Sequence, residues 1–516
     1  MRPFLSVFVW ALAILALPVS AGSAQTQPVS AAAGMLPARY PDAELSGNIT
    51  SADHQTYQHI PFTMPEGVDR LVVAFDYDGR EQKTVIDLGI EDPHGFRGAS
   101  GGNKAHFTIA RSDATPSYLP GPLDPGEWAL SLGVPNVRQG VVSAWHARLW
   151  FLKGAEAQML PAPTKGRGPG WYRGDLHLHT GQSDGSCDSQ SGRRVPCPLF
   201  RTLERAATQG LDFVAVTEHN TSSHANGLYE AQPYFDQMLL IPGREITTFF
   251  GHFNIFGVTE PLDFQILPNS ETSFNSIADR VHRLGGLVSI NHPALPSGEI
   301  CMGCGWTMGD PSFVHPVDYT KVDAVEVING SATASADSDA EGIVSGISFW
   351  VEQLENGFAL AAVGGSDNHD PDREGLGSIA APVTVVEAAD LTASALFDGI
   401  RNGRSFVVID PSIAPLHLDF SLDAGGEVVR MGGEARLAEG DTITLIPDIA
   451  APANSVVEVY DGEERQLETF VSPEGDGLTF TLDSAGVHAI HLRIRSAEGN
   501  LVALGSAVRV TVMSPD

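Results

Sequence analysis

The sequence predicts an α/β fold for its central part, with β-rich regions on either side. Between about residues 170 and 412, short apolar runs rich in β-branched residues alternate with helix-like stretches, which is typical of parallel β/α architecture. Histidine and carboxylate residues follow most of these runs. Because a β/α barrel carries its active site at the carboxyl ends of its strands, this placement favours such a barrel.

The N-terminus predicts a signal peptide over residues 1–24 and a flexible leader over 25–44. A short basic start precedes an almost wholly apolar run from Phe4 to Leu17, and small residues from Ala21 to Ala24 offer a cleavage site. The apolar run is short for a bilayer span, and an uncleaved anchor is the alternative. We therefore expect a periplasmic or secreted protein without a membrane span after cleavage.

The flanking regions read as β-sandwiches. Residues 45–160 contain short alternating runs broken by Gly, Pro and Asp, such as Arg70–Asp76, and predict an N-terminal β-sandwich. Pro161 to Pro169 reads as a linker before the central region, 170–412. Strand-like runs such as Leu416–Leu422 then return, and residues 413–516 predict a C-terminal Ig-like β-sandwich.

Helix-like patterns in the central region cover Leu199–Gln209, Ser273–Leu284 and Leu391–Asn402. For the last of these, Asp390 is placed to cap the start and Gly403 to end the helix.

His177 and His179 carry the most informative chemical signal. Residues two apart in a strand point to the same face, so the two imidazoles would aim at one point, as a divalent metal requires. Further ligand-type residues, most of them beside strand-like runs, follow along the chain: Asp184, His219, Glu245, His252, His292, Asp367 and His369. This series predicts a metal site.

The order of the motifs resembles the PHP (polymerase and histidinol phosphatase) superfamily over about residues 170–410. The motifs are Asp175-Leu-His-Leu-His-Thr, Thr217-Glu-His-Asn, Gly243-Arg-Glu-Ile-Thr with Gly251-His, Asn291-His-Pro and Gly365-Ser-Asp-Asn-His. The resemblance implies a distorted (β/α)7 PHP barrel with two or three divalent metals. Export and β-rich flanks make the chain most similar to the carbaryl-hydrolase-like branch.

The resemblance also implies the role of each residue. The first metal set is His177, His179, Glu245 and Asp367. The second is Glu245, His252 and His292, with Glu245 bridging. The third is Asp184, His219 and His369. Glu245, Asp367 and His292 are the implied catalytic residues. Glu218 stands where many relatives have Asp, and together with Asn220, Asn291 and Asn329 it is expected to orient the ligands or the substrate.

Such a site predicts hydrolysis. Water held between two cations loses a proton near neutral pH and supplies a bridging hydroxide, so no serine or cysteine nucleophile is needed. The metals also stabilise the developing oxyanion. Imidazole ligands suit zinc, manganese or iron, and the mixed carboxylates do not select among them.

The four cysteines form two local pairs, Cys187 with Cys197 and Cys301 with Cys304. In an exported protein we expect disulfides, although four cysteines permit three connectivities. A zinc site built from all four thiolates is the alternative.

Charge and pocket residues bear on the substrate. Acidic residues outnumber basic ones 63 to 31, for a formal charge of −32, which repels nucleic acid and favours a small-molecule substrate. We expect phosphoesters, because a third metal suits a phosphate dianion. A carbamate or carboxylic ester is the alternative, because basic residues near the motifs are few: Arg244, Arg373 and Arg404. Apolar residues that could line a pocket are Phe249, Phe250, Trp306 and Phe313.

A non-catalytic, metal-stabilised glycan-binding scaffold is a further alternative. The sequence does not indicate an oligomeric state.

Overall fold

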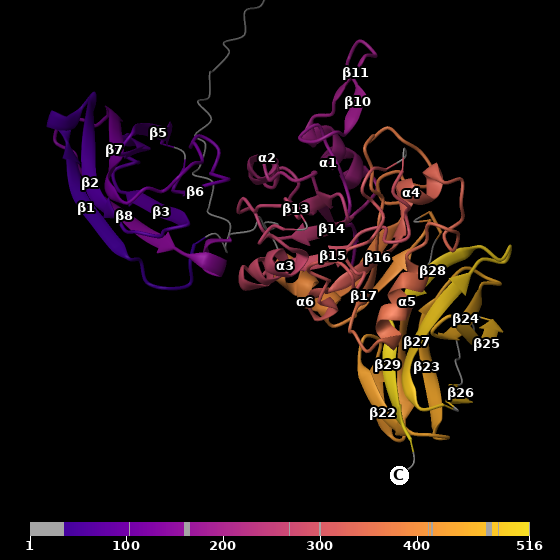
Figure 1. Ribbon diagram of the computed structural model, residues 1–516. Helices are drawn as coiled ribbons and strands as arrows, with labels where there is room; N and C mark the ends of the chain where they lie inside the picture. Colours follow the sequence, from indigo (N-terminus) through magenta and orange to yellow (C-terminus); the bar gives the residue numbers. More distant parts are fainter. Residues whose placement is uncertain are drawn as a thin grey trace, which may run out of the picture.

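The computed structural model describes residues 36–102, 104–158, 166–267, 269–298, 301–410, 412–413, 416–470, 477–482 and 484–514. The predicted signal peptide, most of the predicted leader and residues 161–165 of the predicted linker lie outside these ranges. Along the chain, an N-terminal β-rich region, a central region and a C-terminal β-rich region follow one another (Figure 1). None of the helices in the described ranges has the length and apolar character needed to cross a membrane.

The N-terminal region consists of two four-stranded antiparallel sheets. The first has the order β1 (Ala43–Thr50), β8 (Val142–Leu152), β3 (Arg70–Tyr77) and β6 (His106–Ala110). The second has the order β2 (Thr56–Met64), β7 (Gly126–Asn136), β4 (Val85–Asp92) and β5 (Gly95–Ser100). Short 3-10 turns lie at Ser51–Asp53 and Gly154–Ala157. Residues of both sheets, among them Leu71, Leu130 and Leu149, form one buried core.

The central region holds a mixed sheet. Its strands are β9 (Gly170–Asp175), β12 (Phe213–Val216), β13 (Leu239–Thr248), β14 (Gly251–Phe256), β15 (Leu287–Ile290), β16 (Ala324–Asn329), β17 (Ala361–Gly365), β18 (Val383–Ala388) and β19 (Ser405–Val408). β9, β12 and β13 are parallel neighbours, as are β15, β16 and β17. β14 runs antiparallel between these two groups, and β18 and β19 pair antiparallel beyond β9. A small hairpin of β10 (Ser186–Asp188) and β11 (Arg194–Pro196) stands apart.

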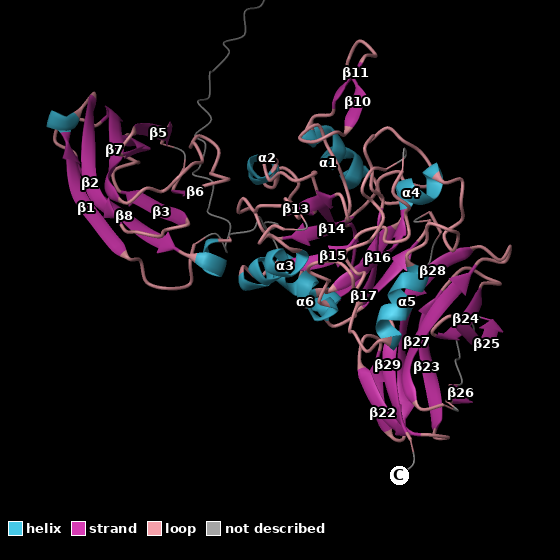
Figure 2. Cartoon of the chain, viewed as in Figure 1, coloured by secondary structure: helices cyan, strands magenta, loops and turns pink. Residues whose placement is uncertain are grey.

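The predicted α/β barrel, including the (β/α)7 form, is wrong. Of the described residues of the whole chain, 42% lie in strands and 13% in helices, so the protein is mostly β rather than α/β (Figure 2). The turn between β13 and β14 consists only of Phe249 and Phe250, whereas a parallel connection needs about a dozen residues. These two strands can therefore pair only antiparallel. Within the described residues, β17 pairs with β16 alone, so the hydrogen-bonded sheet does not close.

The helices of the described residues are short. They are α1 (Leu199–Thr208), α2 (Ala225–Ala231), α3 (Phe274–Arg283), α4 (Gly330–Ser335), α5 (Ile347–Glu355) and α6 (Ala393–Arg401), with a 3-10 turn at Tyr319–Lys321. α1, α3 and α6 occupy the three stretches predicted to be helical. The predicted cap of α6 is wrong: Thr392, not Asp390, caps it, because the Thr392 hydroxyl accepts a hydrogen bond from the Ala395 N–H.

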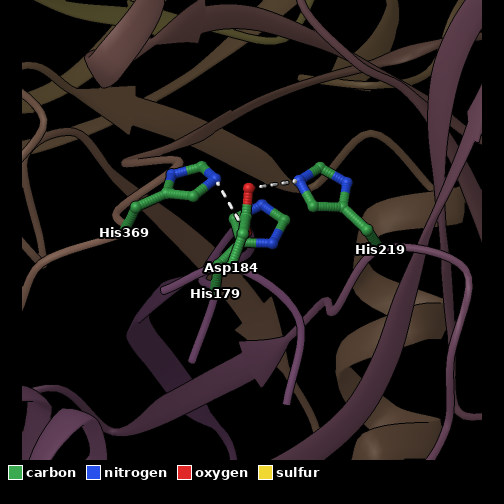
Figure 3. Close-up of side chains that lie close together, drawn as sticks. All are labelled: His179, Asp184, His219 and His369. Atoms are coloured by element: carbon green, nitrogen blue, oxygen red, sulfur yellow. Dashed lines mark ion pairs between the residues drawn. The ribbon is translucent and has the colours of Figure 1, made fainter. Parts of the chain in front are cut away.

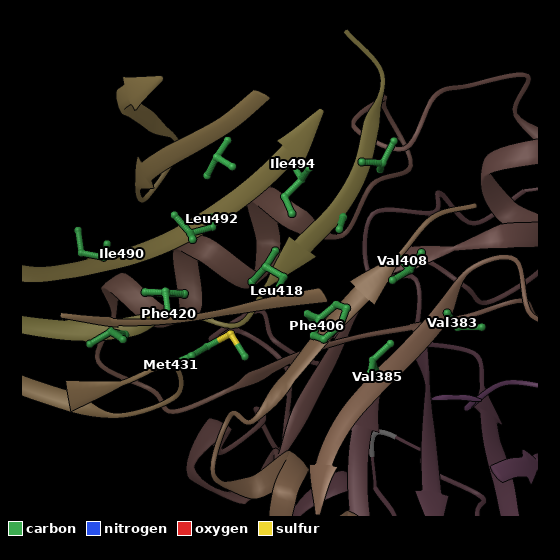
Figure 4. Close-up of a cluster of buried hydrophobic side chains, with 14 of the residues drawn as sticks. Val383, Val385, Phe406, Val408, Leu418, Phe420, Met431, Ile490, Leu492 and Ile494 are labelled. Atoms are coloured by element: carbon green, nitrogen blue, oxygen red, sulfur yellow. The ribbon is translucent and has the colours of Figure 1, made fainter. Parts of the chain in front are cut away.

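The C-terminal region is not a separate sandwich. One of its sheets is formed by β20 (His417–Ala424), β21 (Glu427–Arg430), β23 (Thr442–Ala450) and β26 (Leu478–Thr481). The other strands are β22 (Glu434–Ala438), β24 (Val456–Asp461), β25 (Glu464–Phe470), β27 (Gly486–Arg495), β28 (Leu501–Gly505) and β29 (Val508–Met513). They extend the central sheet, since β28 pairs antiparallel with β19. Phe406 of β19 and Leu418 of β20 share one buried core with β27 (Figure 4).

Candidate metal centre

The predicted ligands meet because the ends of neighbouring strands meet. His177 and His179 follow β9, His219 follows β12 and His292 follows β15. Asp367 and His369 follow β17, while Glu245 and His252 face each other across the β13–β14 hairpin. The segments that follow β9 and β17 are also joined by backbone hydrogen bonds. The His179 N–H donates to the Asn368 carbonyl, and the Asp367 N–H donates to the His177 carbonyl.

The first group surrounds a carboxylate of Asp367. The Nε2 atoms of His177 and His179 lie 3.3 and 3.1 Å from Asp367 Oδ1. Both Nε2 atoms also lie 3.6 Å from Glu245 Oε2. His177, His179 and Asp367 therefore present ligand atoms close enough to share one cation.

The second group uses the other oxygen of Glu245. Glu245 Oε1 lies 3.2 Å from His252 Nδ1 and 3.3 Å from His292 Nε2. It also accepts a hydrogen bond of 3.0 Å from the Asn291 side-chain amide. One oxygen of Glu245 thus faces the first group and the other faces the second, which is the arrangement that a bridging carboxylate needs.

The third group lies nearest to solvent. Asp184 Oδ2 is 3.5 Å from His219 Nε2, and Asp184 Oδ1 is 3.4 Å from His369 Nε2 (Figure 3). His179 contributes to this group as well. His219 Nδ1 lies 2.9 Å from Glu245 Oε2, which connects the third group to the first. The Asp184 side chain is 57% exposed, whereas those of His177 and His179 are fully buried.

Two of the predicted orienting residues contact the ligands directly. Asn291 donates to Glu245, and Asn329 donates a hydrogen bond of 3.2 Å to Asp367 Oδ2. Glu326 joins them: one of its oxygens lies 2.9 Å from His177 Nδ1, and the other accepts from the His292 N–H at 2.9 Å. A carboxylate behind a ligating histidine fixes the tautomer of the ring and its orientation.

The other two predicted orienting residues fix loops. Glu218 accepts hydrogen bonds from the Thr180 N–H and from the hydroxyls of Thr180 and Ser183. Asn220 pairs with the backbone of Thr247, accepting from its N–H and donating to its carbonyl, both at 2.9 Å. The Thr247 hydroxyl in turn lies 2.6 Å from His219 Nδ1. The hydrogen bonds of Glu218 and Asn220 therefore fix the backbone segments that carry the predicted ligands.

Sequence reasoning gave no role to Asp175, which is fully buried beneath the centre. It accepts hydrogen bonds from the N–H groups of His177, Ser366 and Ala380. Burial raises the pKa of Asp175 to about 6, against the effect of these hydrogen bonds. The signal was present, because Asp175 begins the His177 motif, but the sequence does not show that it joins three separate segments.

The backbone at the centre is unusual. Asn220, His292 and Asp367 adopt φ values of 54°, 28° and 51°, in the left-handed region that side chains other than glycine rarely occupy. Each of the three follows a strand and belongs to a predicted ligand motif. Such conformations concentrate at functional sites, where the surrounding structure holds them in place.

The charges in the centre are strongly coupled. Burial acts to raise the pKa of Glu245 and of Asp367, but the positive charge of His177 lowers both pKa values well below their usual range. Burial acts to lower the pKa of His177, and the surrounding carboxylates raise it instead. Burial and the charge of His369 lower the pKa of His179 to about 3. The centre therefore combines ionised carboxylates with a positively charged His177 and an uncharged His179.

The donor set fits divalent cations. Several buried atoms of the centre form no hydrogen bond within the described part of the chain: His177 Nε2, both ring nitrogens of His179, Glu245 Oε2, His252 Nε2 and His292 Nδ1. An unpartnered buried polar atom costs about 1–3 kcal/mol. A cation held between His177 Nε2, His179 Nε2 and Glu245 Oε2 would remove that cost for these three atoms. Mixed imidazole and carboxylate ligands suit zinc, manganese or iron.

The cysteines form the two local pairs that the sequence predicts. The Cα atoms lie 4.9 Å apart in Cys187–Cys197 and 5.7 Å apart in Cys301–Cys304, both within disulfide range. This pairing leaves no thiolate for the alternative four-cysteine zinc site. Cys304 Sγ lies 3.7 Å from His252 Nδ1, so the second pair borders the metal centre.

Comparisons with known proteins give no relative: no protein-family model matches the chain, and no match was found among curated proteins.

Proposed function

We propose that this protein is a metal-dependent hydrolase that acts on phosphoesters. The observation that carries the proposal is the placement of Glu245, whose two oxygens face two separate groups of buried imidazoles. The order of the ligand motifs, which resembles that of the PHP superfamily, supports it. The proposal does not depend on a barrel fold.

The predicted ligands form three proposed cation sites. His177, His179, Asp367 and Glu245 would hold one cation, and Glu245, His252 and His292 would hold a second. Asp184, His219 and His369 would hold a third. Bound divalent cations would activate water and polarise the scissile bond of the substrate. Glu326 and Asn329 position His177 and Asp367 from behind. Substrate would approach past Asp184, because this carboxylate is exposed while the inner histidines are buried.

The third group favours phosphoesters. It lies at the exposed side of the centre, where additional positive charge would neutralise a phosphate dianion. Two of the three nearby arginines do not serve this purpose: Arg244 donates to the Glu260 carbonyl, and Arg404 forms an ion pair with Asp419. The third arginine, Arg373, donates a hydrogen bond to the Ser331 hydroxyl.

A carbamate or carboxylic ester is the second candidate substrate. Phe249 is 77% exposed and Met302 is 84% exposed. The two belong to adjoining loops, because Gly303 packs against the backbone of Phe249. They offer an apolar surface beside His252. By contrast, Phe250, Trp306 and Phe313 pack against the core of the central region.

We also propose that the protein is exported. The apolar N-terminal segment motivates this, and the two cysteine pairs are compatible with an oxidising compartment.

The decisive experiment combines metal analysis with assays. Purified protein should bind two or three divalent cations per chain and hydrolyse an aryl phosphate, an aryl ester or an N-methylcarbamate. A chelator should abolish the activity, and zinc or manganese should restore it. At most one cation after reconstitution, or activity that survives chelation, would contradict the proposal. Full metal content without any hydrolysis would favour the glycan-binding scaffold.

A further inference from the structure

A second site lies outside the metal centre. A cavity of about 550 Å³ is bounded by β9, the end of α1, the segment after His369 and the segment after β19. Its lining residues include Arg173, Arg205, Gln209 and Ser378. None of the nine predicted metal ligands lines it.

The two arginines of this cavity have no side-chain partners among the described residues. No hydrogen bond or ion pair of either guanidinium group is formed within the described ranges, and Arg205 Nε is buried without a hydrogen bond. The side chains of Gln209 and Ser378, both half-buried, also form none among these residues. Four polar side chains that can donate therefore line one cavity with their hydrogen-bonding capacity unused.

The other buried and half-buried arginines of the described ranges behave differently, because each of them forms a side-chain hydrogen bond. Arg509 lines a second cavity, of about 370 Å³, but it donates there to Glu434 and to the Gly357 carbonyl. Arg70 and Arg404 are also bound by carboxylates. Arg173 and Arg205 are therefore the exceptions among the buried and half-buried arginines of the described ranges, and their cavity leaves both guanidinium groups free to bind a ligand.

We propose that this cavity binds a small oxyanion, a phosphate or a carboxylate. Planar guanidinium groups match both kinds of anion with paired hydrogen bonds. Glu374 and Asp410 also line the cavity, but both are exposed, and Asp410 already accepts from the N–H and the hydroxyl of Ser412. Because both carboxylates are exposed, solvent and salt screen their repulsion of an anion held by the two arginines.

The cavity shares a wall with the metal centre. Ser378 and Ala381 line the cavity, and hydrogen bonds from the other side fix the segment from Gly377 to Ala381. The Asn368 amide donates to the Gly377 carbonyl at 2.8 Å, and the Ala380 N–H donates to Asp175 at 3.0 Å. An anion in the cavity would therefore contact the segment that follows Asp367 and His369.

The test is a calorimetric titration of the full chain after metal removal, so that the anion cannot bind at the metal centre. Inorganic phosphate and succinate are titrated separately at constant ionic strength. We expect saturable binding of at least one of them, with affinity about 10-fold or more weaker in Arg173→Gln and in Arg205→Gln, because each loses a charge-assisted hydrogen bond. Tighter phosphate binding assigns a phosphate ligand, and tighter succinate binding assigns a carboxylate.

Arg283→Gln is the matched control, since Arg283 occupies the last turn of α3 as Arg205 occupies the last turn of α1. It should bind like the wild type. If Arg205→Gln does not fold, Arg205→Lys, which keeps the charge but loses the planar fork, should weaken binding to a smaller extent. The proposal is overturned if neither anion binds saturably, if both cavity variants bind like the wild type, or if the control loses as much affinity as they do. The result does not depend on hydrolase activity.

Discussion

Two buried charged clusters of this molecule differ in how their polar atoms are used. At the junction between the N-terminal and central regions, Arg70 donates two hydrogen bonds to Asp113, of 2.6 and 3.0 Å, and one to the Ala157 carbonyl. Asp113 also accepts from the Thr259 hydroxyl of the central region. In the metal centre, by contrast, His177 Nε2 and both ring nitrogens of His179 form no hydrogen bond within the described part of the chain. Arg70, Asp113, His177 and His179 are all almost fully buried, but only the Arg70–Asp113 pair is satisfied by hydrogen bonds within the protein.

This difference in hydrogen bonding distinguishes a buried ion pair with a structural role from buried charged residues with a functional role. A buried ion pair whose hydrogen bonds are complete holds two regions together and needs nothing else. A buried group of imidazoles and carboxylates with unpartnered atoms would gain stability from a cation that binds those atoms. Burial and charge alone therefore do not distinguish the two roles, whereas the unpartnered atoms do.

The largest effect should come from Glu245→Gln. This change removes the charge that both inner groups face, so we expect loss of the shared cations and a fall in activity of at least about 10³-fold on every substrate. Elemental analysis and kcat/KM values measure the two effects. Glu230→Gln, at an exposed position of α2, is the control and should retain both. Full activity in Glu245→Gln would show that the centre is not the reacting site.

Much of the centre was predictable because its residues are close in sequence to strand ends. His177 and His179 are two apart, and period-two geometry places them together without any knowledge of the fold. The roles of Asp175 and Thr247 could not be read in this way, because they depend on hydrogen bonds to residues far away in the chain. Asp175, for example, binds the N–H of Ala380.

The barrel prediction failed for a related reason. Apolar runs were read as strands separated by helices, but sequence periodicity does not give the direction of a strand. The two residues between β13 and β14 should have excluded a parallel connection there. The continuation of the central sheet through β19 and β28 is a long-range pairing, and nothing local in either strand predicts it.

The second-largest effect is expected at the junction between the N-terminal and central regions. Arg70→Met leaves Asp113 buried without its partner, and we expect destabilisation of about 3–5 kcal/mol, seen as a lower thermal midpoint. Metal content and kcat/KM of the folded protein should not change. Arg148→Met, which breaks only an exposed pair with Asp76, should have little effect.

A double variant sharpens this test. Arg70→Met combined with Asp113→Leu removes both charges, so it should recover part of the lost stability. If Arg70→Met instead removes the metals, the junction and the metal centre are not independent.

The third-largest effect distinguishes the exposed third ligand group from the two inner groups of the metal centre. His369 belongs to the exposed third group, so His369→Ala should leave the inner cations in place. Phosphoester turnover should fall by about 10²-fold or more, because a phosphate dianion depends most on the additional charge, while ester turnover falls much less. The measurement is kcat/KM on an aryl phosphate and an aryl ester, with exposed His315→Ala as the control. Equal slowing of both substrates at full metal content would refute this division of roles.

The smallest effect lies at the junction between the central and C-terminal regions, where Glu341 binds Arg493 and Arg495 of β27. Burial acts to raise the pKa of Glu341, but the hydrogen bonds from Arg495 and Arg493 lower it below the ordinary value of 4.5. Because the pKa is lower in the folded than in the unfolded protein, this carboxylate stabilises the fold above about pH 4.5 and loses its contribution as the pH falls through the folded-state value.

Glu341→Gln should therefore lower the thermal midpoint at pH 7, by an amount corresponding to roughly 1 kcal/mol. The difference between the variant and the wild type should shrink at pH 4 and below, where the wild-type carboxylate becomes protonated. Thermal unfolding of both proteins at several pH values measures this. Metal-free protein should be used, so that protonation of the metal ligands does not contribute. A difference that stays constant from pH 7 to pH 3 would show that Glu341 acts through packing rather than through its charge, and this junction would then differ from the one at Arg70.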